Sequence, residues 1–482
     1  MCTAPRIWLI SSLALTLAGC GGQEVSATGR SLPDGPARRV ILITCDTLRA
    51  DHLSSYGYGR PTSPRIDELA KESVLFTNAW SAAPRTMPAV SSLLTGRLPD
   101  EIGATPSNMD LMPAEALTLA EVMRDAGFGT AAIVANSVLR RADAERGDIG
   151  VQQGFVHFDD TMTQHPTINA APERDSDAVT DAALKWLAAR GADEDRFLLW
   201  VHYMDPHGPY LPAAEHLAPF VRDHAGESEL PVAQSPGEAG AIPLYQVVGE
   251  ERKPGQYVDR YDGEIHQVDA EVGRLLDALR ARGWLEDALV VFTSDHGESL
   301  GESNRWFSHG DSLQRELVHV PLIVRPPQSL RENLISGEGG RRNGKLVMHL
   351  DVWPTVLRAI GIPGHPNRGL SLLQSKLPEG RISAHFFGRL DTPRRMISVT
   401  DGRWHMVTIG PKFPTLYDMS TDPRETTNVV AANPAIMQRL QARYDEFMSQ
   451  GQSNRLTGTT RVLDEKARRG MNSLGYTGGD DH

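Results

Sequence analysis

The apolar residues of this chain gather into short continuous runs that are separated by longer amphipathic stretches. The first run, Val40 to Ile43, is followed by polar residues that include Thr44 and Asp46. A short apolar run with polar ends is typical of a parallel strand that is buried on both faces. Four later runs have the same character, and they are Thr130 to Val134, Phe197 to Val201, Leu289 to Thr293 and Pro321 to Val324.

Amphipathic segments with helical spacing separate these predicted strands. They are Leu117 to Ala126, Ala178 to Ala189 and Val268 to Arg282. Alternation of strands and helices predicts an α/β layered domain with a mainly parallel central sheet. Ligands of such sheets bind outside the carboxyl ends of the strands. Because Asp46, Asp205 and Asp295 each follow a predicted strand, we expect all three at one edge of the sheet.

The alternation is interrupted in two places. Residues 212–256 are rich in Pro, Gly, Glu and Ala, and both an insertion over the active-site rim and an excursion without function fit them. Beyond residue 370, a hairpin around Asp401-Gly402 and a helix from Pro434 to Ser449 predict a smaller α+β subdomain. The predicted divisions are a catalytic domain at 39–370, a C-terminal subdomain at 371–454 and a polar tail at 455–482.

The N-terminus carries a targeting signal. Arg6 precedes an apolar stretch, Ile7 to Leu17, that is too short to span a bilayer comfortably. The stretch ends in Leu-Ala-Gly-Cys20, which resembles a bacterial lipoprotein box. This resemblance implies that residues 1–19 are a removed signal peptide and that 20–38 form a tether. It also implies that a lipid on Cys20 anchors the protein in the bacterial cell envelope, with Gly21 favouring the outer membrane; a plain secretory signal is the alternative.

Composition and charge indicate which kinds of partner to expect. The 482 residues are 40% hydrophobic and 23% charged, which is ordinary for a globular protein. The formal net charge of −12 lacks a basic block, so nucleic acid is not expected as a partner. With Cys2 in the signal and Cys20 acylated, Cys45 has no cysteine with which to form an internal disulfide. The sequence leaves the oligomeric state open.

One hydroxyl stands at the start of a predicted helix. Thr86 lies just before Pro88, and the N–H groups of a first helical turn form a natural seat for a tetrahedral anion. A hydroxyl there is a candidate nucleophile for a phosphoryl or sulfuryl group. Asp46, Asp295 and His296 are suitable ligands for a divalent cation, which would lower the pKa of that hydroxyl.

These residues lie within a set of motifs that resembles the sulfatase family, within the alkaline phosphatase superfamily. The motifs are Pro88 with Ser92-Leu93-Leu94-Thr95-Gly96, residues 47–53, 61–64 and 261–265, Asp295-His296-Gly297-Glu298, residues 350–357 and residues 416–428. The resemblance implies an alkaline-phosphatase-like layered domain and a hydrolase or transferase of sulfate or phosphate esters. It implies one divalent metal, Ca, Mn, Mg or Zn, on Asp46, Thr86, Asp295 and His296. It also implies that His207 and His309 face the transferred group or its leaving oxygen.

The chain departs from the family pattern at several positions. Thr86 replaces the Cys or Ser that sulfatases convert to formylglycine, and Thr47 replaces the second Asp of the first metal pair. Ala89 and Val90 replace a Ser and an Arg, and Asn136 replaces a Lys. A further His, expected near Ile102-Gly103, is absent. These changes predict a pocket that is less cationic than a sulfatase pocket and that depends on the metal for positive charge.

Three interpretations follow. In the leading one, Thr86 forms a covalent intermediate with the sulfate or phosphate of a small-molecule or glycan ester. A variant adds a second metal on Asp205, His207 and His309. The competing interpretation is a catalytically degenerate surface protein that binds sulfated or phosphorylated glycans. In each of them, we interpret His52 as structural and His202 as a packed side chain with satisfied nitrogens.

Overall fold

The structure is a computed structural model. It describes residues 35–103, 110–141, 150–163, 173–191, 195–335, 341–363, 367–374, 376–388, 395–410, 414–450, 456 and 459–460. The predicted signal segment 1–19, nearly all of the tether and most of the tail lie outside these residues. No helix among the described residues combines the length and the apolar character needed to cross a membrane.

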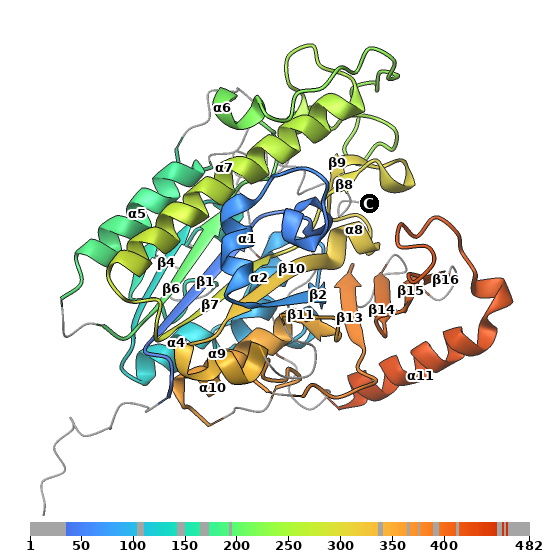
Figure 1. Ribbon diagram of the computed structural model, residues 1–482. Coiled ribbons are helices and arrows are strands. Elements are labelled where there is room, and N and C mark those ends of the chain that lie inside the picture. Colours follow the sequence, from blue (N-terminus) through green and yellow to red (C-terminus); the bar gives the residue numbers. More distant parts are fainter. Residues whose placement is uncertain are drawn as a thin grey trace, which may run out of the picture. The chain divides into compact units, whose positions relative to one another are not determined.

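Among the described residues, a nine-stranded sheet forms the centre of the predicted catalytic domain, in the order β11-β2-β10-β7-β1-β6-β4-β5 with β12 beside β2 (Figure 1). β1 pairs in parallel with both β6 and β7, and β10 is antiparallel to its two neighbours. The predicted mainly parallel sheet is therefore confirmed. Its strands are β1 (Arg39–Cys45), β2 (Val74–Trp80), β4 (Gly129–Val134), β5 (His157–Asp159), β6 (Phe197–Tyr203), β7 (Ala288–Ser294), β10 (His319–Arg325), β11 (Arg342–Asn343) and β12 (Val347–Met348).

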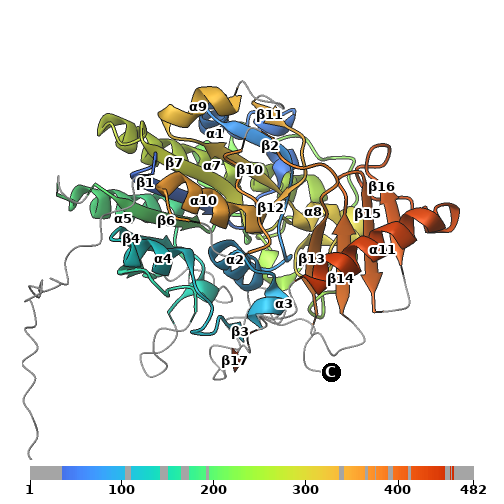
Figure 2. The ribbon, with the colours of Figure 1, turned by 90° about the horizontal axis from the view of Figure 1, so that it is seen from below.

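Helices cover both faces of this sheet. In Figures 1 and 2, α1, α5 and α7 pack together over one face, while α2, α4 and α10 lie over the other. Every residue of β1, β6 and β7 is buried, as expected for strands between two helical layers. The helices are α1 (Pro64–Lys71), α2 (Thr86–Thr95), α3 (Pro99–Ile102), α4 (Leu119–Asp125), α5 (Ser176–Ala188), α6 (Ala214–Leu217), α7 (Pro254–Ala281), α8 (Arg315–Val318), α9 (Gln328–Ile335), α10 (Val352–Ile360) and α11 (Pro434–Ser449).

Helix α7 is longer than its predicted part, because it begins at Pro254 rather than at Val268. Tyr257, Tyr261 and Ile265 extend its buried face towards the N-terminus by about three turns. Between them lie Asp259 and Asp262, which are also buried, and ion pairs with Arg60 offset the cost of burying their charges. Apolar periodicity alone does not reveal a helical face that is half aromatic and half ionic.

The C-terminal subdomain is an antiparallel sheet with α11 packed against it, which confirms the predicted smaller α+β unit (Figure 2). It joins the larger domain through a hydrogen bond from Phe386 N to Ala82 O and through the stacked rings of Trp80 and His385. Its strands are β13 (Ser383–Phe387), β14 (Met396–Thr400), β15 (Trp404–Ile409) and β16 (Thr415–Asp418). Two small sheets pair β3 (Asp110–Leu111) with β17 (Thr459–Thr460) and β8 (Ser299–Leu300) with β9 (Trp306–Ser308).

Residues 212–253, which we call the rim segment, precede α7. The segment contains α6 and a bridge between Val232 and Ile242. Phe220 and Ile242 are fully buried, and Gly240 N donates to Asn304 O at 2.8 Å. The rim segment is therefore packed onto the β8–β9 region.

Candidate active site

Four polar side chains meet where adjacent parallel strands end. Asp46 follows β1, Asp295 follows β7, Asn136 follows β4, and His202 is the penultimate residue of β6. The strand registers align Thr44 with both His202 and Thr293, so the ends of these strands lie level. Asp205 also follows β6 at this edge, so the structure has the common sheet edge that was expected for Asp46, Asp205 and Asp295.

Thr86 begins α2 directly above this edge. Its Oγ1 lies 3.5 Å from Asp46 Oδ2 and 3.4 Å from His296 Nε2. The preceding residue, Arg85, has extended backbone, so α2 starts abruptly at the hydroxyl residue. Gly96, in the left-handed conformation, ends the helix by donating its N–H to Ser92 O. Because the whole helix is buried, Thr86 is held against the carboxylates by the core rather than by a surface loop.

His296 is oriented by its own backbone. Its Nδ1 donates to Gly297 O at 2.9 Å, which leaves the lone pair of Nε2 to face the site. That Nε2 lies 3.8 Å from Asp46 Oδ1 and 3.5 Å from Asp295 Oδ2. The four predicted metal ligands, Asp46, Thr86, Asp295 and His296, are thus brought together, at separations too long for strong hydrogen bonds.

His202 joins this group, and one part of the prediction for it is wrong. The side chain is packed, with no exposed surface, but neither ring nitrogen has a hydrogen-bond partner among the described residues. Its Nε2 lies 3.9 Å from Asp46 Oδ2. Ligand atoms of Asp46, His202 and Asp295 all lie within 4.8 Å of one another. Apolar flanking residues made His202 resemble an ordinary strand residue in the sequence.

The electrostatics of the site favour a bound cation. Burial and the charge of Asp295 raise the pKa of Asp46 well above its ordinary value, although hydrogen bonds from Asn136 and Thr86 oppose the rise. Asp46 Oδ1 and Asp295 Oδ2 are buried and have no hydrogen-bond partner among the described residues. Burial lowers the pKa of His202 to about 4, so its imidazole is neutral at neutral pH and able to bind a metal. Two orphaned carboxylate oxygens and a neutral imidazole fit a divalent cation.

Thr47, which stands where the family has a second Asp, has an unusual backbone. Its φ is 56°, a strained value for a β-branched residue. Its N–H donates to Asp295 Oδ1 at 3.2 Å, and its carbonyl accepts from Tyr261 at 2.8 Å. The backbone of Thr47 thus holds Asp295, while its buried Oγ1 has no partner among the described residues.

The two predicted catalytic histidines lie together beside the metal ligands. The rings of His207 and His309 have centroids 5.0 Å apart, and that of His309 lies 4.7 Å from His296. His207 Nδ1 donates to Gly208 O at 2.7 Å, and His309 Nδ1 lies 3.2 Å from Glu298 Oε1. Burial lowers the pKa of both groups, that of His207 to about 4.

Asp205 does not join these histidines. Its Oδ2 accepts a hydrogen bond from Gln267 at 3.3 Å, and burial raises its pKa to about 6. Across the described residues, Asp205, His207 and His309 form no group of ligand atoms comparable to that of Asp46. His52 contacts Asp262 at 2.8 Å, as expected of a structural side chain.

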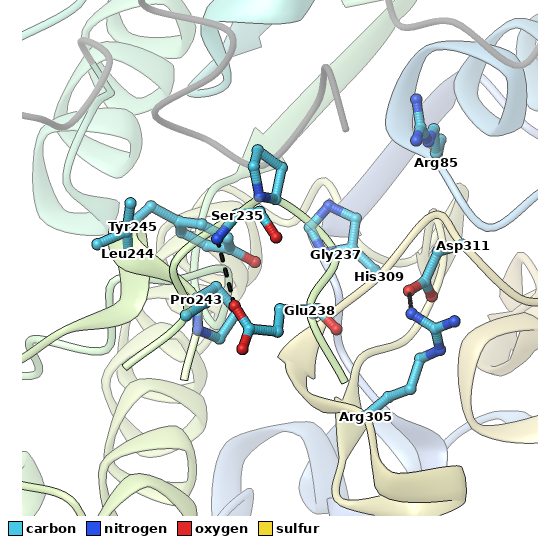
Figure 3. Close-up of a pocket in the computed structure, with 13 residues that line it drawn as sticks. Arg85, Ser235, Gly237, Glu238, Pro243, Leu244, Tyr245, Arg305, His309 and Asp311 are labelled. Carbon is cyan, nitrogen blue, oxygen red and sulfur yellow. Dashed lines mark hydrogen bonds and ion pairs between the residues drawn. The ribbon is translucent and has the colours of Figure 1, made fainter. Parts of the chain in front are cut away.

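A pocket of about 100 Å³ opens next to His309. Figure 3 shows Arg305 and Asp311 paired on one side of it, with Leu244 and Tyr245 of the rim segment opposite. The Tyr245 ring also lies 6.2 Å from that of His207, so the pocket reaches both predicted catalytic histidines.

Arg85 also lines this pocket, and it was not singled out from the sequence. It is buried, its Nε donates to Gly310 O at 3.0 Å, and its guanidinium lies over Phe387 at 5.0 Å. Its position directly before Thr86 was the available signal. Arg85 thus places positive charge next to Thr86, although Val90 and Ile102 are buried apolar residues.

The sulfatase family model matches residues 38–362, which is most of the chain. This chain belongs to the sulfatase family. Among curated proteins, the sulfatase chain is similar to an N-acetylglucosamine-6-O-sulfatase of Bacteroides thetaiotaomicron, at 22% identity over 88% of this chain and 87% of that protein. It is also similar to an ulvan-active sulfatase of Formosa agariphila, at 26% identity over 89% of this chain and 84% of that protein.

Solved structures agree on the fold of this sulfatase. The phosphonate monoester hydrolase of Agrobacterium radiobacter has a TM-score of 0.69 at 21% identity, over 88% of this chain and all of that one. A second solved protein, in complex with its substrate D-glucosamine-2-N,6-O-disulfate, also has a TM-score of 0.69. Its identity is 19%, over 88% of this chain and 99% of that one. The alkaline-phosphatase-like fold is therefore confirmed.

Proposed function

We propose that this sulfatase-family hydrolase cleaves a sulfate or phosphate ester of a glycan or small molecule through a covalent Thr86 intermediate. The observation that carries the proposal is the position of Thr86 Oγ1, 3.5 Å from Asp46 Oδ2 and 3.4 Å from His296 Nε2 at the start of a buried helix. Relatives named as glycan sulfatases support the substrate class.

Asp46, Thr86, Asp295 and His296 are the residues that would hold one divalent metal. Bound there, the metal would lower the pKa of the Thr86 hydroxyl and neutralise charge on the non-bridging oxygens. The N-terminus of α2 adds N–H groups that favour a tetrahedral anion. The site thus combines a nucleophile with two sources of positive potential.

The reaction balances in two steps. In the first, Thr86 Oγ1 bonds to the sulfur or phosphorus, the bond to the alcohol oxygen breaks, and the proton of Thr86 ends on the departing alcohol. In the second, water attacks the same atom, its proton returns to Thr86, and sulfate or phosphate leaves. His207 and His309 are the proposed carriers of these protons, because their rings lie beside the metal ligands.

A variant pair tests the nucleophile. Activity is measured on aryl sulfates, aryl phosphates and phosphonate monoesters with added Zn²⁺, Mn²⁺, Ca²⁺ or Mg²⁺. Thr86→Ala is expected to lose at least about a thousandfold in kcat, while Thr86→Ser keeps a hydroxyl and retains measurable turnover. Mass spectrometry of rapidly quenched enzyme is expected to find the modified Thr86 peptide. Unchanged turnover in Thr86→Ala would exclude Thr86 as the nucleophile.

The same panel separates an enzyme from a degenerate glycan-binding protein. If every ester and metal combination fails while sulfated glycans still bind, the protein is a binder and the hydrolase proposal is wrong. Val90, Ile102 and Asn136, which stand where family cations do, motivate that alternative.

We also propose that the enzyme works at the bacterial cell envelope, anchored by a lipid on Cys20. Arg6, the apolar stretch to Leu17 and the box ending at Cys20 support this proposal. The test is membrane fractionation of the full chain with a Cys20→Ser variant. A Cys20→Ser protein that stays in the membrane fraction would contradict the anchor.

A further inference from the structure

We propose that His202 is a ligand of the metal, taking the place of the carboxylate absent at Thr47, and that the site selects Zn²⁺ over Ca²⁺ or Mg²⁺. This inference rests on the metal of the proposed function and adds both a ligand and a class of ion to it.

The first support is the condition of the His202 side chain. It lies near the end of β6, between β1 and β4 in the middle of the sheet, and has no exposed surface. Neither ring nitrogen has a hydrogen-bond partner among the described residues. A buried imidazole without partners is unfavourable, because it has lost its contacts with water. Coordination would supply the missing partner.

The second support is the direction in which His202 faces. Its Nε2 lies 3.9 Å from Asp46 Oδ2, and one ligand atom each of Asp46, His202 and Asp295 fall within 4.8 Å of one another. Two ligands with bonds of about 2.1 Å to one ion lie roughly 3 to 4.2 Å apart. The Asp46–His202 and Asp46–His296 separations of 3.9 and 3.8 Å fall in that range and exceed a hydrogen bond.

The third support is the change at Thr47. Its hydroxyl is neutral and has no partner among the described residues, and its N–H binds Asp295. The site therefore has two carboxylates, Asp46 and Asp295, that match the charge of one divalent ion. His202 restores the number of donors without adding a third negative charge.

The donor set decides the class of ion. Ca²⁺ takes six to eight oxygen ligands, and Mg²⁺ prefers oxygen in near-ideal octahedral geometry. Imidazole nitrogen suits Zn²⁺, and affinity for such sites rises from Mn²⁺ towards Cu²⁺ and remains high for Zn²⁺. With His202 and His296 both facing Asp46, half of the four strong donors are nitrogen.

The test measures metal binding rather than turnover. The full chain is stripped with a chelator and titrated with Zn²⁺, Ca²⁺ and Co²⁺, and the visible spectrum of the Co²⁺ form is recorded. His202→Gln is compared with His349→Gln, which removes another buried imidazole, one that contacts Thr293 Oγ1 at 3.3 Å and lies outside the ligand group. We expect His202→Gln to weaken Zn²⁺ binding at least tenfold and to alter the Co²⁺ spectrum, and His349→Gln to do neither.

The outcomes separate this inference from the proposed function. A Zn²⁺ affinity and Co²⁺ spectrum unchanged by His202→Gln would overturn His202 as a ligand and leave the hydrolase proposal standing. Preference for Ca²⁺ would overturn the ion class. If no divalent ion binds at all, both proposals fail. If His202→Gln does not fold, X-ray absorption of the unaltered Zn²⁺ protein decides, since two imidazoles are expected and a single one would contradict the inference.

Discussion

The side-chain amide of Asn136 donates a 2.6 Å hydrogen bond to Asp46 Oδ2, at the position where the sulfatase motif has a lysine. Asn136 Oδ1 in turn accepts the N–H of Val138, so the amide is fixed by the backbone that follows β4. Asp46 Oδ1 has no hydrogen-bond partner among the described residues, and it lies 3.8 Å from His296 Nε2. Asn136 thus lacks the charge of a lysine but orients the carboxylate of Asp46 through its hydrogen bond.

We predict that Asn136→Leu lowers metal affinity by about ten- to a hundredfold, the usual effect of removing a group that orients a ligand. Asp46 would lose its strongest hydrogen bond and with it a fixed orientation. Competition with a chromophoric chelator measures the dissociation constant. Asn343→Leu, in an amide outside the site that accepts Lys345 N, is the control. Equal dissociation constants for Asn136→Leu and the unaltered protein would mean that Asn136 does not position Asp46.

Two substitutions in the pocket beside His309 are predicted to change KM in opposite directions. Arg305 and Asp311 form an ion pair there, and burial raises the pKa of Asp311 although Arg305 and Arg85 oppose the rise. Arg305→Gln leaves a negative charge facing an anionic substrate, so we expect KM for aryl sulfates or phosphates to rise about tenfold, with kcat little changed. Asp311→Asn leaves the positive partner and is expected to lower KM. Michaelis–Menten analysis decides, and a parallel rise of KM in both variants would point to a disturbed fold instead.

The rim segment is predicted to loosen as pH rises. His224 contacts Glu227 at 2.7 Å and Asp259 of α7 at 2.8 Å. Burial lowers the pKa of His224, but the hydrogen bonds to Asp259 and Glu227 outweigh it, so the pKa lies above its usual 6.5. A group with a raised folded pKa stabilises the fold fully below the unfolded value and loses that effect as pH rises through the folded one. Attachment of this segment to α7 should therefore weaken above about pH 6.5.

Hydrogen exchange, corrected for its intrinsic pH dependence, measures this attachment in residues 220–230. Protection is expected to fall between pH 6 and pH 9 (about the range in which a perturbed histidine titrates). His224→Gln should show low protection at both pH values. Equal pH dependence in the variant would show that another group controls the segment.

Much of the fold could be predicted because its signals are local. Continuous apolar runs marked β1, β6 and β7, and the helix Pro434–Ser449 was predicted at the bounds that the structure has. The start of α7 could not be predicted this way, since Asp259 and Asp262 are buried through ion pairs with residues about 200 positions away in the chain. Such pairing leaves no periodic trace in a single sequence.

The candidate site could likewise be predicted only in part from the sequence. Thr86, Asp46, Asp295 and His296 stood in motifs, and the structure brings them together. His202 was missed because its significance lies in lacking partners, a property of the packed structure. Roles for these residues stay predictions until binding and turnover are measured.

Metal removal should destabilise the protein, and increasingly so as pH rises. Without metal, burial and the Asp295 charge raise the pKa of Asp46, so the folded state favours a protonated carboxyl. An acid with a raised folded pKa costs stability as pH rises above its unfolded value, about 3.9. A bound divalent ion reverses this effect, because it requires the ionised carboxylates, and its affinity therefore rises with pH. At a free metal concentration about a thousandfold above Kd, the stabilisation is about 4 kcal/mol.

Thermal unfolding of metal-loaded and chelated protein at pH 5, 6.5 and 8 (a range chosen to lie roughly above the unfolded carboxyl pKa) should show a gap in Tm that widens with pH. A gap that stays constant or narrows would contradict binding of the ion by Asp46 and Asp295, because a site made of ionised carboxylates gains affinity as pH rises.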